Sequence, residues 1–249
     1  MRVAVGCPIH NRAWIFAEYV EHVHIAFDIA GLSPIWIFNV GVDSDGSDDG
    51  TRNLVAELLQ KESGIFVEAN EPDLSPIRGQ WNGERYRQMA TYRNQLLALV
   101  RTEQPDYFLS LDSDILLHPT ALLCLVETIT HVHEIQGQSM LYDAVGGKAF
   151  LSEGSGSNIT TYASGLGQNS GLIRQNADGV FPVQILMAIK LMSPAAYQIP
   201  YEYNQWGEDI SWSLNCGKAG LRLGWDGRVS SKHVMRQELL NKIDPRVGW

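Results

Sequence analysis

The fold can be read from one stretch of the chain, Tyr107-Phe108-Leu109-Ser110-Leu111-Asp112-Ser113-Asp114. Apolar residues around a small serine are typical of a buried strand in an α/β sheet, and this run ends where the two acids begin. Ligands of open α/β sheets bind beyond the carboxyl ends of the strands, so Asp112 and Asp114 are expected to point into a site. Two hard oxygen donors at this position suit Mg²⁺ or Mn²⁺.

Two acids at this spacing also occur in solvated turns, because Asp-x-Asp is a short pattern. The residues that follow favour a site instead. Ile115-Leu116-Leu117 is apolar, and Pro119 stands where proline commonly opens a helix. A turn surrounded by water would not be flanked by this much apolar sequence.

Composition bounds the class of protein. The chain has 249 residues, 45% of them hydrophobic, which is enough for one large core, and we expect a single domain over residues 1–249. Its formal net charge of −9 disfavours a stable nucleic-acid or membrane partner.

The cysteines Cys7, Cys124 and Cys216 form no Cys-x-x-Cys pair, so neither a disulfide framework nor a zinc site is indicated. With no signal-peptide pattern and no run approaching about 18 apolar residues, the predicted location is cytoplasmic.

Strands and helices alternate through the first half of the chain, as they do in a parallel sheet covered by helices. Apolar strands are predicted over residues 3–6, 35–40 and 64–69, each followed by a helical pattern. Beyond the central strand, the pattern predicts a helix over 119–135 and strands near 141–150, 183–191 and 221–226. Residues 152–171 are half glycine or serine, which favours a mobile flap.

Several residues in the first half suit an anionic ligand. Arg12 stands at the start of the first predicted helix, and Asp43 is the acid nearest the end of the second strand. The helix after the third strand has a basic beginning, with Arg87 and Arg93 among its residues. Cations near a helix N-terminus oppose the helix dipole, so a bound anion would relieve an unfavourable placement. Arginines that simply face solvent are the alternative.

Aromatic side chains crowd an acidic pair in the second half. Trp206 and Trp212 flank Glu208 and Asp209 at the start of a predicted helix. An apolar ring face beside hydrogen-bond acceptors is what a sugar needs, although acids at a helix start also cap it. A carboxylate beside indole rings is expected to be partly desolvated, which would make Asp209 more basic than a surface acid. Further on, His233 is either a third metal ligand or a structural histidine.

In series, these segments resemble a GT-A-fold glycosyltransferase of the large inverting class that uses nucleotide sugars. The resemblance rests on six short elements that cover nearly the whole chain in order: Pro8-Ile9-His10-Asn11-Arg12, Asp43 with Ser47-Asp48-Asp49-Gly50-Thr51, Tyr92-Arg93-Asn94, Asp112-Ser113-Asp114, Glu208-Asp209 and His233. The family usually has alanine where Tyr92 stands, so either Arg87 or Arg93 matches its phosphate or base contact. The implied fold is a mostly parallel central sheet flanked by helices, with a nucleotide-binding half over 1–115 and an acceptor-binding half over 116–249.

The resemblance implies a metal-dependent enzyme that moves a sugar from a UDP- or GDP-type donor to the hydroxyl of an unknown acceptor, with inversion. Asp112, Asp114 and His233 would hold Mn²⁺ or Mg²⁺ on the diphosphate. Asp209 matches the catalytic carboxylate, and Glu208 would support it or contact the acceptor together with Trp206. The nucleotide sugar would contact the other matched residues: Pro8, His10, Asn11, Arg12, Asp43, Arg87, Arg93, Asp112 and Ser113.

The chemistry of such a transfer agrees with these residue types. Cleaving a sugar–diphosphate bond builds negative charge on the leaving group, which a metal held by carboxylates stabilises without a proton donor. The attacking hydroxyl loses a proton, and a carboxylate across the sugar ring is suited to accept it.

Two other classes stay open from the sequence. A nucleotidyltransferase of related architecture would need a Gly-rich loop with Arg and Lys after the first strand, which Gly6-Cys7-Pro8-Ile9-His10-Asn11 does not supply. A non-catalytic, calcium-dependent sugar-binding module would use the same acids structurally. It would bind a ligand without releasing nucleotide from a donor, and that difference separates it from the enzyme.

Overall fold

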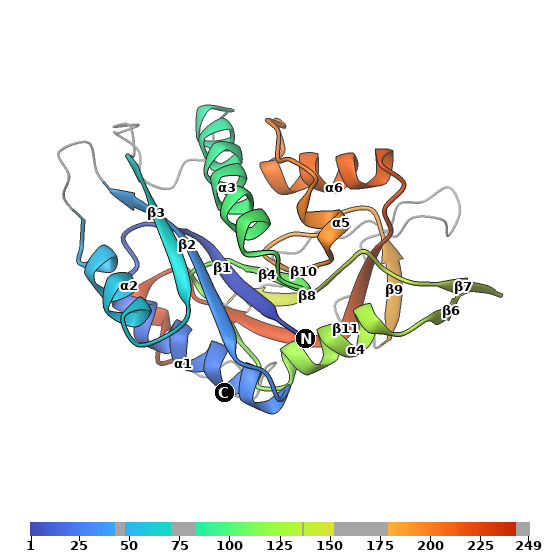
Figure 1. Ribbon diagram of the computed structural model, residues 1–249, viewed down its shortest axis with the longest axis horizontal. Helices are drawn as coiled ribbons and strands as arrows, with labels where there is room; N and C mark the ends of the chain where they lie inside the picture. The colour runs from blue at the N-terminus through green and yellow to red at the C-terminus, as the bar shows by residue number, and fades with distance from the viewer. Residues whose placement is uncertain (43–47, 71–82, 136, 152–178, 243–249) are drawn as a thin grey trace.

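The computed structural model describes residues 1–42, 48–70, 83–135, 137–151 and 179–242. A central sheet of nine strands lies between two layers of helices (Figure 1). The strands follow the order β3-β2-β1-β4-β10-β8-β11-β5, with β9 paired to β11. Their bounds are β1 Val3–Ile9, β2 Pro34–Val42, β3 Gly64–Asn70, β4 Tyr107–Leu111, β5 Ile115–Leu117, β8 Ala144–Leu151, β9 Val180–Val183, β10 Ile189–Met192 and β11 Leu223–His233.

The strand directions make the sheet mostly parallel. β1, β2, β3 and β4 are mutually parallel, while β10 runs antiparallel between β4 and β8. β11 is parallel to β8, whereas β5 and β9 are antiparallel to β11. Six of the nine strands therefore point one way, and the predicted fold class is confirmed.

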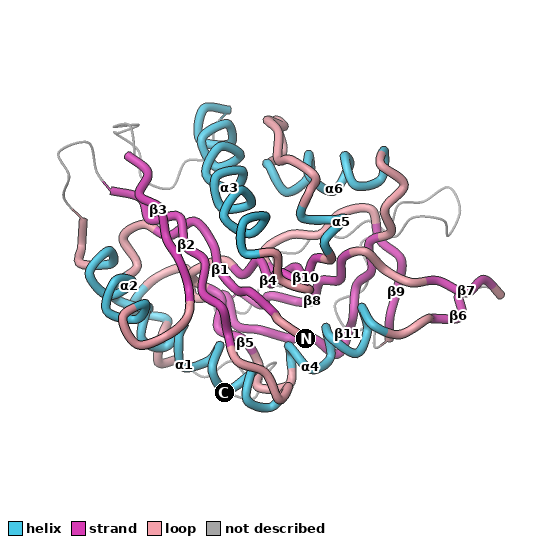
Figure 2. The backbone as a smooth tube through the Cα atoms, viewed as in Figure 1, coloured by secondary structure: helices cyan, strands magenta, loops and turns pink. Residues whose placement is uncertain are grey.

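Helices cover both faces of this sheet (Figures 1 and 2). Buried residues of α1, α2 and α4 pack with one face, and buried residues of α3, α5 and α6 pack with the other. The apolar residues of each helix recur at helical spacing, so each presents one apolar side to the sheet. The helix bounds are α1 Ala13–Ile29, α2 Thr51–Leu59, α3 Gly83–Glu103, α4 Ala121–Thr130, α5 Pro194–Tyr197 and α6 Glu208–Lys218, with a 3₁₀ turn, η1, at Gln237–Leu239.

The predicted central strand is confirmed as β4, and the first three strands lie where the apolar runs placed them. β1 and β2 approach each other so closely that a Cβ on Gly6 would lie 1.6 Å from the carbonyl oxygen of Ile37. Only glycine fits there, because it carries no Cβ.

The helix predicted over residues 119–135 is wrong in its length. α4 ends at Thr130, and His131 already has an extended backbone, with φ −106° and ψ 147°. The following residues form β6 His133–Ile135, which pairs with β7 Gln138–Met140 in a separate hairpin. In the sequence, the helical spacing of apolar residues continues past Thr130, and no proline or glycine marks the end of the helix.

The single strand predicted over residues 183–191 is also wrong. Its two ends belong to β9 and β10, which pair with different neighbours in the sheet. Between them, the Ser213 hydroxyl accepts a hydrogen bond from the Leu186 N–H at 3.0 Å and donates to the Leu186 carbonyl oxygen at 3.3 Å. The Ser213 side chain thus takes the place of a neighbouring strand as hydrogen-bond partner of Leu186, which an apolar run in the sequence does not indicate.

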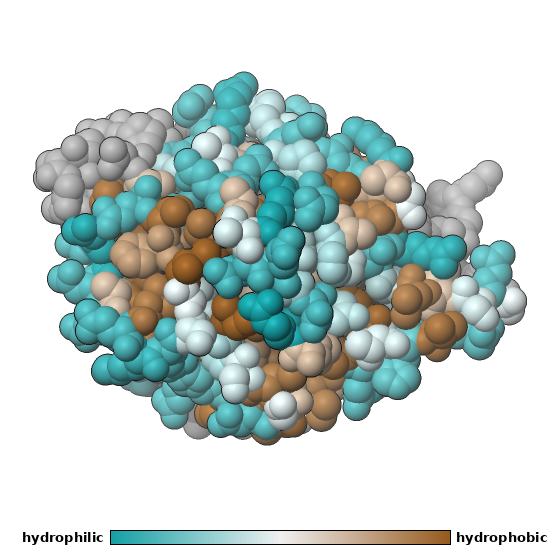
Figure 3. Space-filling view, in the orientation of Figure 1, coloured by the Kyte–Doolittle hydropathy of each residue, from teal (hydrophilic) through white to brown (hydrophobic). Residues whose placement is uncertain are grey.

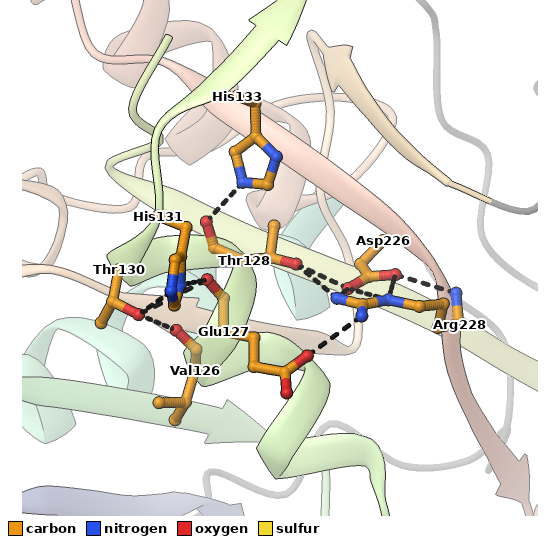
Figure 4. A network of polar contacts seen from close by, with 8 residues as sticks. All are labelled: Val126, Glu127, Thr128, Thr130, His131, His133, Asp226 and Arg228. Atoms are coloured by element: carbon orange, nitrogen blue, oxygen red, sulfur yellow. Dashed lines mark hydrogen bonds and ion pairs between the residues drawn. The ribbon is translucent and has the colours of Figure 1, made fainter.

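The last predicted strand, 221–226, is only the first part of a longer bulged strand, β11, whose pairing with β8 shifts register between Trp225 and Ser230. Inside the bulge, the fully buried Asp226 accepts a 2.6 Å hydrogen bond from Thr128 of α4 and pairs with Arg228 (Figure 4). Arg228 also reaches Glu127, with Nη1 3.0 Å from Oε2. These contacts fix the bulge against α4, and the bulge sets where the end of β11 lies.

Within the described residues, no helix is both long and apolar enough to cross a membrane. On the face drawn in Figure 3, apolar groups are separated by polar side chains. All three cysteines are free; Cys7 and Cys216 are buried and Cys124 is partly buried.

Candidate functional site

The site forms where β1, β4 and β11 end on the same edge of the sheet. After β4 the chain turns through residues 112–114 and continues as β5, which pairs antiparallel with the end of β11. This pairing sets His233 opposite Ile115, and the Val234 N–H donates to the Asp114 carbonyl oxygen at 2.8 Å. Backbone pairing thus brings a histidine from the far end of the chain to the Asp-x-Asp turn.

Asp114 is the centre of the first group of charges. Its Oδ1 lies 3.2 Å from His233 Nε2, and its Oδ2 lies 3.2 Å from Arg12 Nη2. Burial alone would raise the pKa of Asp114, but the hydrogen bond and charge of His233, with the charge of Arg12, lower it. Burial lowers the pKa of His233, whereas Asp114 and Asp112 raise it, and the net shift is upward. Asp114 and His233 thus shift each other's pKa in opposite directions at the edge of the sheet.

Arg93 is the centre of the second group. It projects from α3, is 3% exposed, and bonds Asp112 Oδ1 through Nη2 at 2.9 Å. Its Nε bonds Glu208 Oε1 at 2.9 Å and lies 3.7 Å from Asp209 Oδ1. One guanidinium therefore joins the Asp-x-Asp turn to the acidic pair at the start of α6. The fixed fork of arginine suits such bridging, which a lysine could not reproduce.

Asp209 has a second cationic partner that the sequence analysis did not identify. Lys190 of β10 is fully buried, and its Nζ lies 2.5 Å from Asp209 Oδ1. Burial alone would raise the pKa of Asp209, but the charges of Arg93 and Lys190 outweigh it and lower that pKa. Glu208 behaves oppositely: its burial and the neighbouring Asp209 raise its pKa more than Arg93 lowers it.

The prediction that Asp209 is more basic than a surface acid is therefore wrong. Trp206 does not desolvate it, because that side chain is 70% exposed. Trp212 is buried, but it stacks on Tyr201, with ring centroids 5.9 Å apart, and Lys190 stands over both rings. The two rings thus contact the cation that pairs with Asp209, and the charges of Arg93 and Lys190 keep the pKa of the carboxylate low.

The loop after β1 is tied to the start of α2. The Arg12 N–H donates to Thr51 Oγ1 at 2.8 Å, and the Asp49 N–H donates to the Asn11 side-chain oxygen at 3.2 Å. Asn11 has a positive φ of 52°, a conformation that asparagine tolerates better than most residues. Asp49 accepts from the Ala13 N–H at 3.0 Å. These bonds hold Arg12 where it meets Asp114.

The other predicted nucleotide contacts belong to several segments of the chain. Pro8 belongs to β1, opposite Asn39 of β2, and His10 follows in the loop. Ser113 lies buried between the two aspartates. Asp43 and the flap predicted over 152–171 lie outside the described residues.

The structure distinguishes the two arginines that the sequence left equivalent. Arg93 enters the buried charge cluster, whereas Arg87 is half exposed, pairs with Glu84 at 3.4 Å and lies 4.2 Å over the Tyr203 ring. Arg87 is thus not brought to Asp112 or Asp114 by any described contact.

Asn94, the neighbour of Arg93, fixes the loop before α6. Its side chain donates to the Tyr201 carbonyl oxygen and accepts from the Tyr201 N–H, both at 2.8 Å. The adjacent pair Arg93-Asn94 therefore holds α6 in two ways, through the acids and through the backbone.

The donor types of Asp112, Asp114 and His233 fit a hard divalent cation: two carboxylates and an imidazole. Asp114 and His233 are in contact, and the Asp112 side chain, two residues earlier, is 30% exposed. In the described part of the chain, no three such side chains are already arranged as a ligand set. The reason is that Asp112 turns toward Arg93 instead.

Two buried nitrogen atoms near the aspartates have no hydrogen-bond partner within the described residues, Arg12 Nε and Arg93 Nη1. Buried donors are normally paired, so these atoms indicate an acceptor beyond those that the described residues supply. Phosphate oxygens are acceptors that arginine prefers. The site therefore suits an anionic ligand near residues 12 and 93.

Lys190 was the main residue that sequence reasoning missed. One signal was present: a lysine interrupts the apolar run at residues 189–192, and a lysine is almost never fully buried without a partner. Its partner, Asp209, lies on another element, so the pairing needed the structure.

Comparison with known proteins comes from structure alone, because no protein-family model and no curated sequence matches the chain. S. aureus TarS (residues 1–349) shares 14% identity at a TM-score of 0.55, covering 94% of this chain and 60% of that one. GalNAc-T7, solved with UDP, GalNAc and Mn²⁺, shares 12% identity at a TM-score of 0.57, covering 95% of this chain and 44% of that one. The chain thus spans less than two thirds of either structure.

Both of these structures are glycosyltransferases, and identities this low establish the fold alone. The chain has a GT-A-like glycosyltransferase fold, as the sequence resemblance predicted.

Proposed function

We propose that the chain is a metal-dependent glycosyltransferase that moves a sugar from a nucleotide-diphosphate sugar to an acceptor hydroxyl, with inversion at the anomeric carbon. One observation carries the proposal. The Arg93 guanidinium, 3% exposed, bonds both Asp112 and Glu208 at 2.9 Å and lies 3.7 Å from Asp209. The acids assigned to the donor and the acids assigned to the acceptor therefore meet on one buried cation.

The donor side lies at the ends of β1, β2 and β4, within residues 1–115. Here Arg12 Nε and Arg93 Nη1, buried and without a partner among the described residues, would bind the diphosphate. Pro8, His10, Asn11, Asp43 and Ser113 complete the proposed nucleotide-sugar contacts, with Arg87 at the margin. The donor base is uracil or guanine, and the UDP in the structure of GalNAc-T7 favours the first.

Asp112, Asp114 and His233 would hold Mn²⁺ or Mg²⁺. The Mn²⁺ in the GalNAc-T7 structure supports the choice of metal. When bound, the cation neutralises the charge that develops on the departing diphosphate. Arg12 adds a fixed positive charge on the same side, since its Nη2 lies 3.2 Å from Asp114.

The acceptor side belongs to residues 116–249. The acceptor oxygen attacks the anomeric carbon, the bond from that carbon to the diphosphate oxygen breaks with its electron pair on the diphosphate, and Asp209 takes the hydroxyl proton. Its lowered pKa keeps it ionised at neutral pH, which is the form that a general base needs. Glu208 orients the acceptor or supports Arg93, and Trp206, 70% exposed, offers an apolar face to an acceptor ring.

The proposal is tested by incubating the protein with Mn²⁺ and a panel of UDP- and GDP-sugars and measuring release of the nucleoside diphosphate. Transfer to water occurs without the natural acceptor, so release of UDP or GDP is the expected result. Binding of a sugar or nucleotide sugar without any release would instead indicate a calcium- or manganese-dependent binding module. Release of pyrophosphate on mixing a sugar phosphate with a nucleoside triphosphate would indicate a nucleotidyltransferase.

A further inference from the structure

Lys190 is an unusual residue for the centre of a sheet. It lies on β10 between β4 and β8, opposite Ser110 on one side and Gly146 on the other, and is fully buried. Burying an ammonium group is costly unless it is paired, so the carboxylate of Asp209 is what makes a lysine tolerable at this position. Lys190 Nζ lies 2.5 Å from Asp209 Oδ1.

Packing alone does not require a lysine at this position. Side chains of a strand alternate between the two faces, and Met192, two residues later, is buried among the residues that pack with α3, α5 and α6. Ile189 and Leu191 belong to the opposite core. An apolar side chain at position 190 would continue the pattern of Met192, so the charge of the lysine serves Asp209.

We propose that Lys190 is a positioning residue of the transfer reaction, which holds the Asp209 carboxylate through Oδ1 and leaves Oδ2 to take the proton of the acceptor hydroxyl. This inference rests on the proposed function. Its geometric basis is that Lys190 Nζ and Arg93 Nε both approach the same oxygen, at 2.5 Å and 3.7 Å. The rings of Tyr201 and Trp212, 5.6 Å and 5.5 Å from Nζ, enclose the ammonium group.

Charged or titratable groups lie near Asp209 on each element packed around it. Lys190 faces it from β10, Arg93 from α3, Glu208 from α6, and the Tyr201 phenol from the loop before α6. Further out, Asp112 lies beyond Arg93, and Cys216 lies near Lys190. Removing Lys190 leaves Arg93 shared between Glu208 and Asp209, so the Asp209 proton should bind more tightly.

The first test measures donor hydrolysis between pH 5 and 9 for the wild type, Lys190→Met and Lys190→Arg. In Lys190→Met, the acid limb of the kcat profile should move upward by about one pH unit or more, because an opposite charge this close is removed. Nucleotide binding should stay unchanged, since the side-chain contacts of Lys190 within the described residues are with Asp209, Tyr201 and Trp212, none of which is assigned to the donor. Lys190→Arg should restore the position of the acid limb. An acid limb at the wild-type pH in folded Lys190→Met would overturn the proposal.

Two further measurements keep the outcome decisive. If Lys190→Met does not fold, Lys190→Gln, which retains a polar group, takes its place in the same profile. In thermal unfolding, the ion pair should stabilise the wild type over Lys190→Met at neutral pH, and the difference should shrink as the pH falls through the folded-state pKa of Asp209. In an Asp209→Asn background, the same lysine substitution should show no such pH dependence; an unchanged pH dependence there would refute the pairing.

The failure of this inference is distinguishable from the failure of the proposed function. Wild-type protein that releases no nucleotide from any donor overturns the proposed function, and the role of Lys190 in it. Wild-type release combined with an unmoved profile in Lys190→Met and Lys190→Gln overturns the role of Lys190 alone.

Discussion

Replacing Arg93 by methionine should destabilise the fold more than any other single change at the site. Its guanidinium is 3% exposed and pairs with Glu208, itself only 5% exposed, and with Asp112. Removing one partner of a buried ion pair costs about 3–5 kcal/mol, because the charge left behind has no counter-ion. Asp112 is 30% exposed at its side chain, so water takes over part of its solvation and most of the loss comes from Glu208.

Urea unfolding at pH 7, followed by circular dichroism, measures this loss for Arg93→Met. Arg93→Met combined with Glu208→Gln is the matched variant, since it removes both charges of the buried pair. The double variant should recover about 0.5–3 kcal/mol relative to Arg93→Met, the range of coupling expected for contacting residues.

Glu208 and Asp209 determine how the stability loss in Arg93→Met changes with pH. Without Arg93, Glu208 and Asp209 gain protons more readily, so Arg93→Met should lose least stability at acidic pH and most at neutral pH. A loss below about 1 kcal/mol at pH 7, or no recovery in the double variant, would contradict the view that one guanidinium neutralises this cluster.

Two further predictions concern regions outside the cluster. Burial raises the pKa of the Cys7 and Cys216 thiols, that of Cys216 to about 12. Both thiols should therefore resist Ellman's reagent at pH 8 until urea unfolds the protein, and Cys124 should react first. Rapid labelling of all three thiols in the native protein would contradict the burial of Cys7 and Cys216. Asp226→Leu should lower the free energy of unfolding by about 2–3 kcal/mol, because it leaves the buried Thr128 hydroxyl without its acceptor. Glu127→Gln, which removes a charge from the exposed pair with Arg228, should change the free energy of unfolding by less than about 1 kcal/mol. Equal effects of the two substitutions in urea unfolding would refute the role of Asp226 in fixing the bulge.

The sequence predicted the parts of the fold that depend on local pattern. β1 to β4 and the helices between them follow from apolar runs and helical spacing, since each element is complete within its own stretch of chain. The turn at Asp112 and Asp114 was found for the same reason, because a buried strand ended in acids.

Pairings between segments far apart in the chain could not be predicted from local sequence pattern. The division of residues 183–191 between β9 and β10 depends on Ser213 of α6, and the bulge of β11 depends on Thr128 of α4. The ionisation of Asp209 is a further case. Nearby tryptophans in the sequence predicted desolvation, whereas the structure exposes Trp206 and supplies Lys190 from a different strand. Long-range partners decided each of these features.

In the proposed site, the turn with Asp112 and Asp114 binds the donor, and the Asp209 carboxylate accepts the proton of the acceptor. Calorimetric titration of Asp114→Asn and Asp209→Asn with UDP or GDP, with and without Mn²⁺, tests it together with donor turnover. Asp114→Asn should lose the Mn²⁺-dependent part of nucleotide binding. Asp209→Asn should bind as the wild type does and lose about 10²–10⁴-fold in turnover, the range for a general base. Wild-type turnover in Asp209→Asn, or undiminished Mn²⁺-dependent binding in Asp114→Asn, would contradict the account.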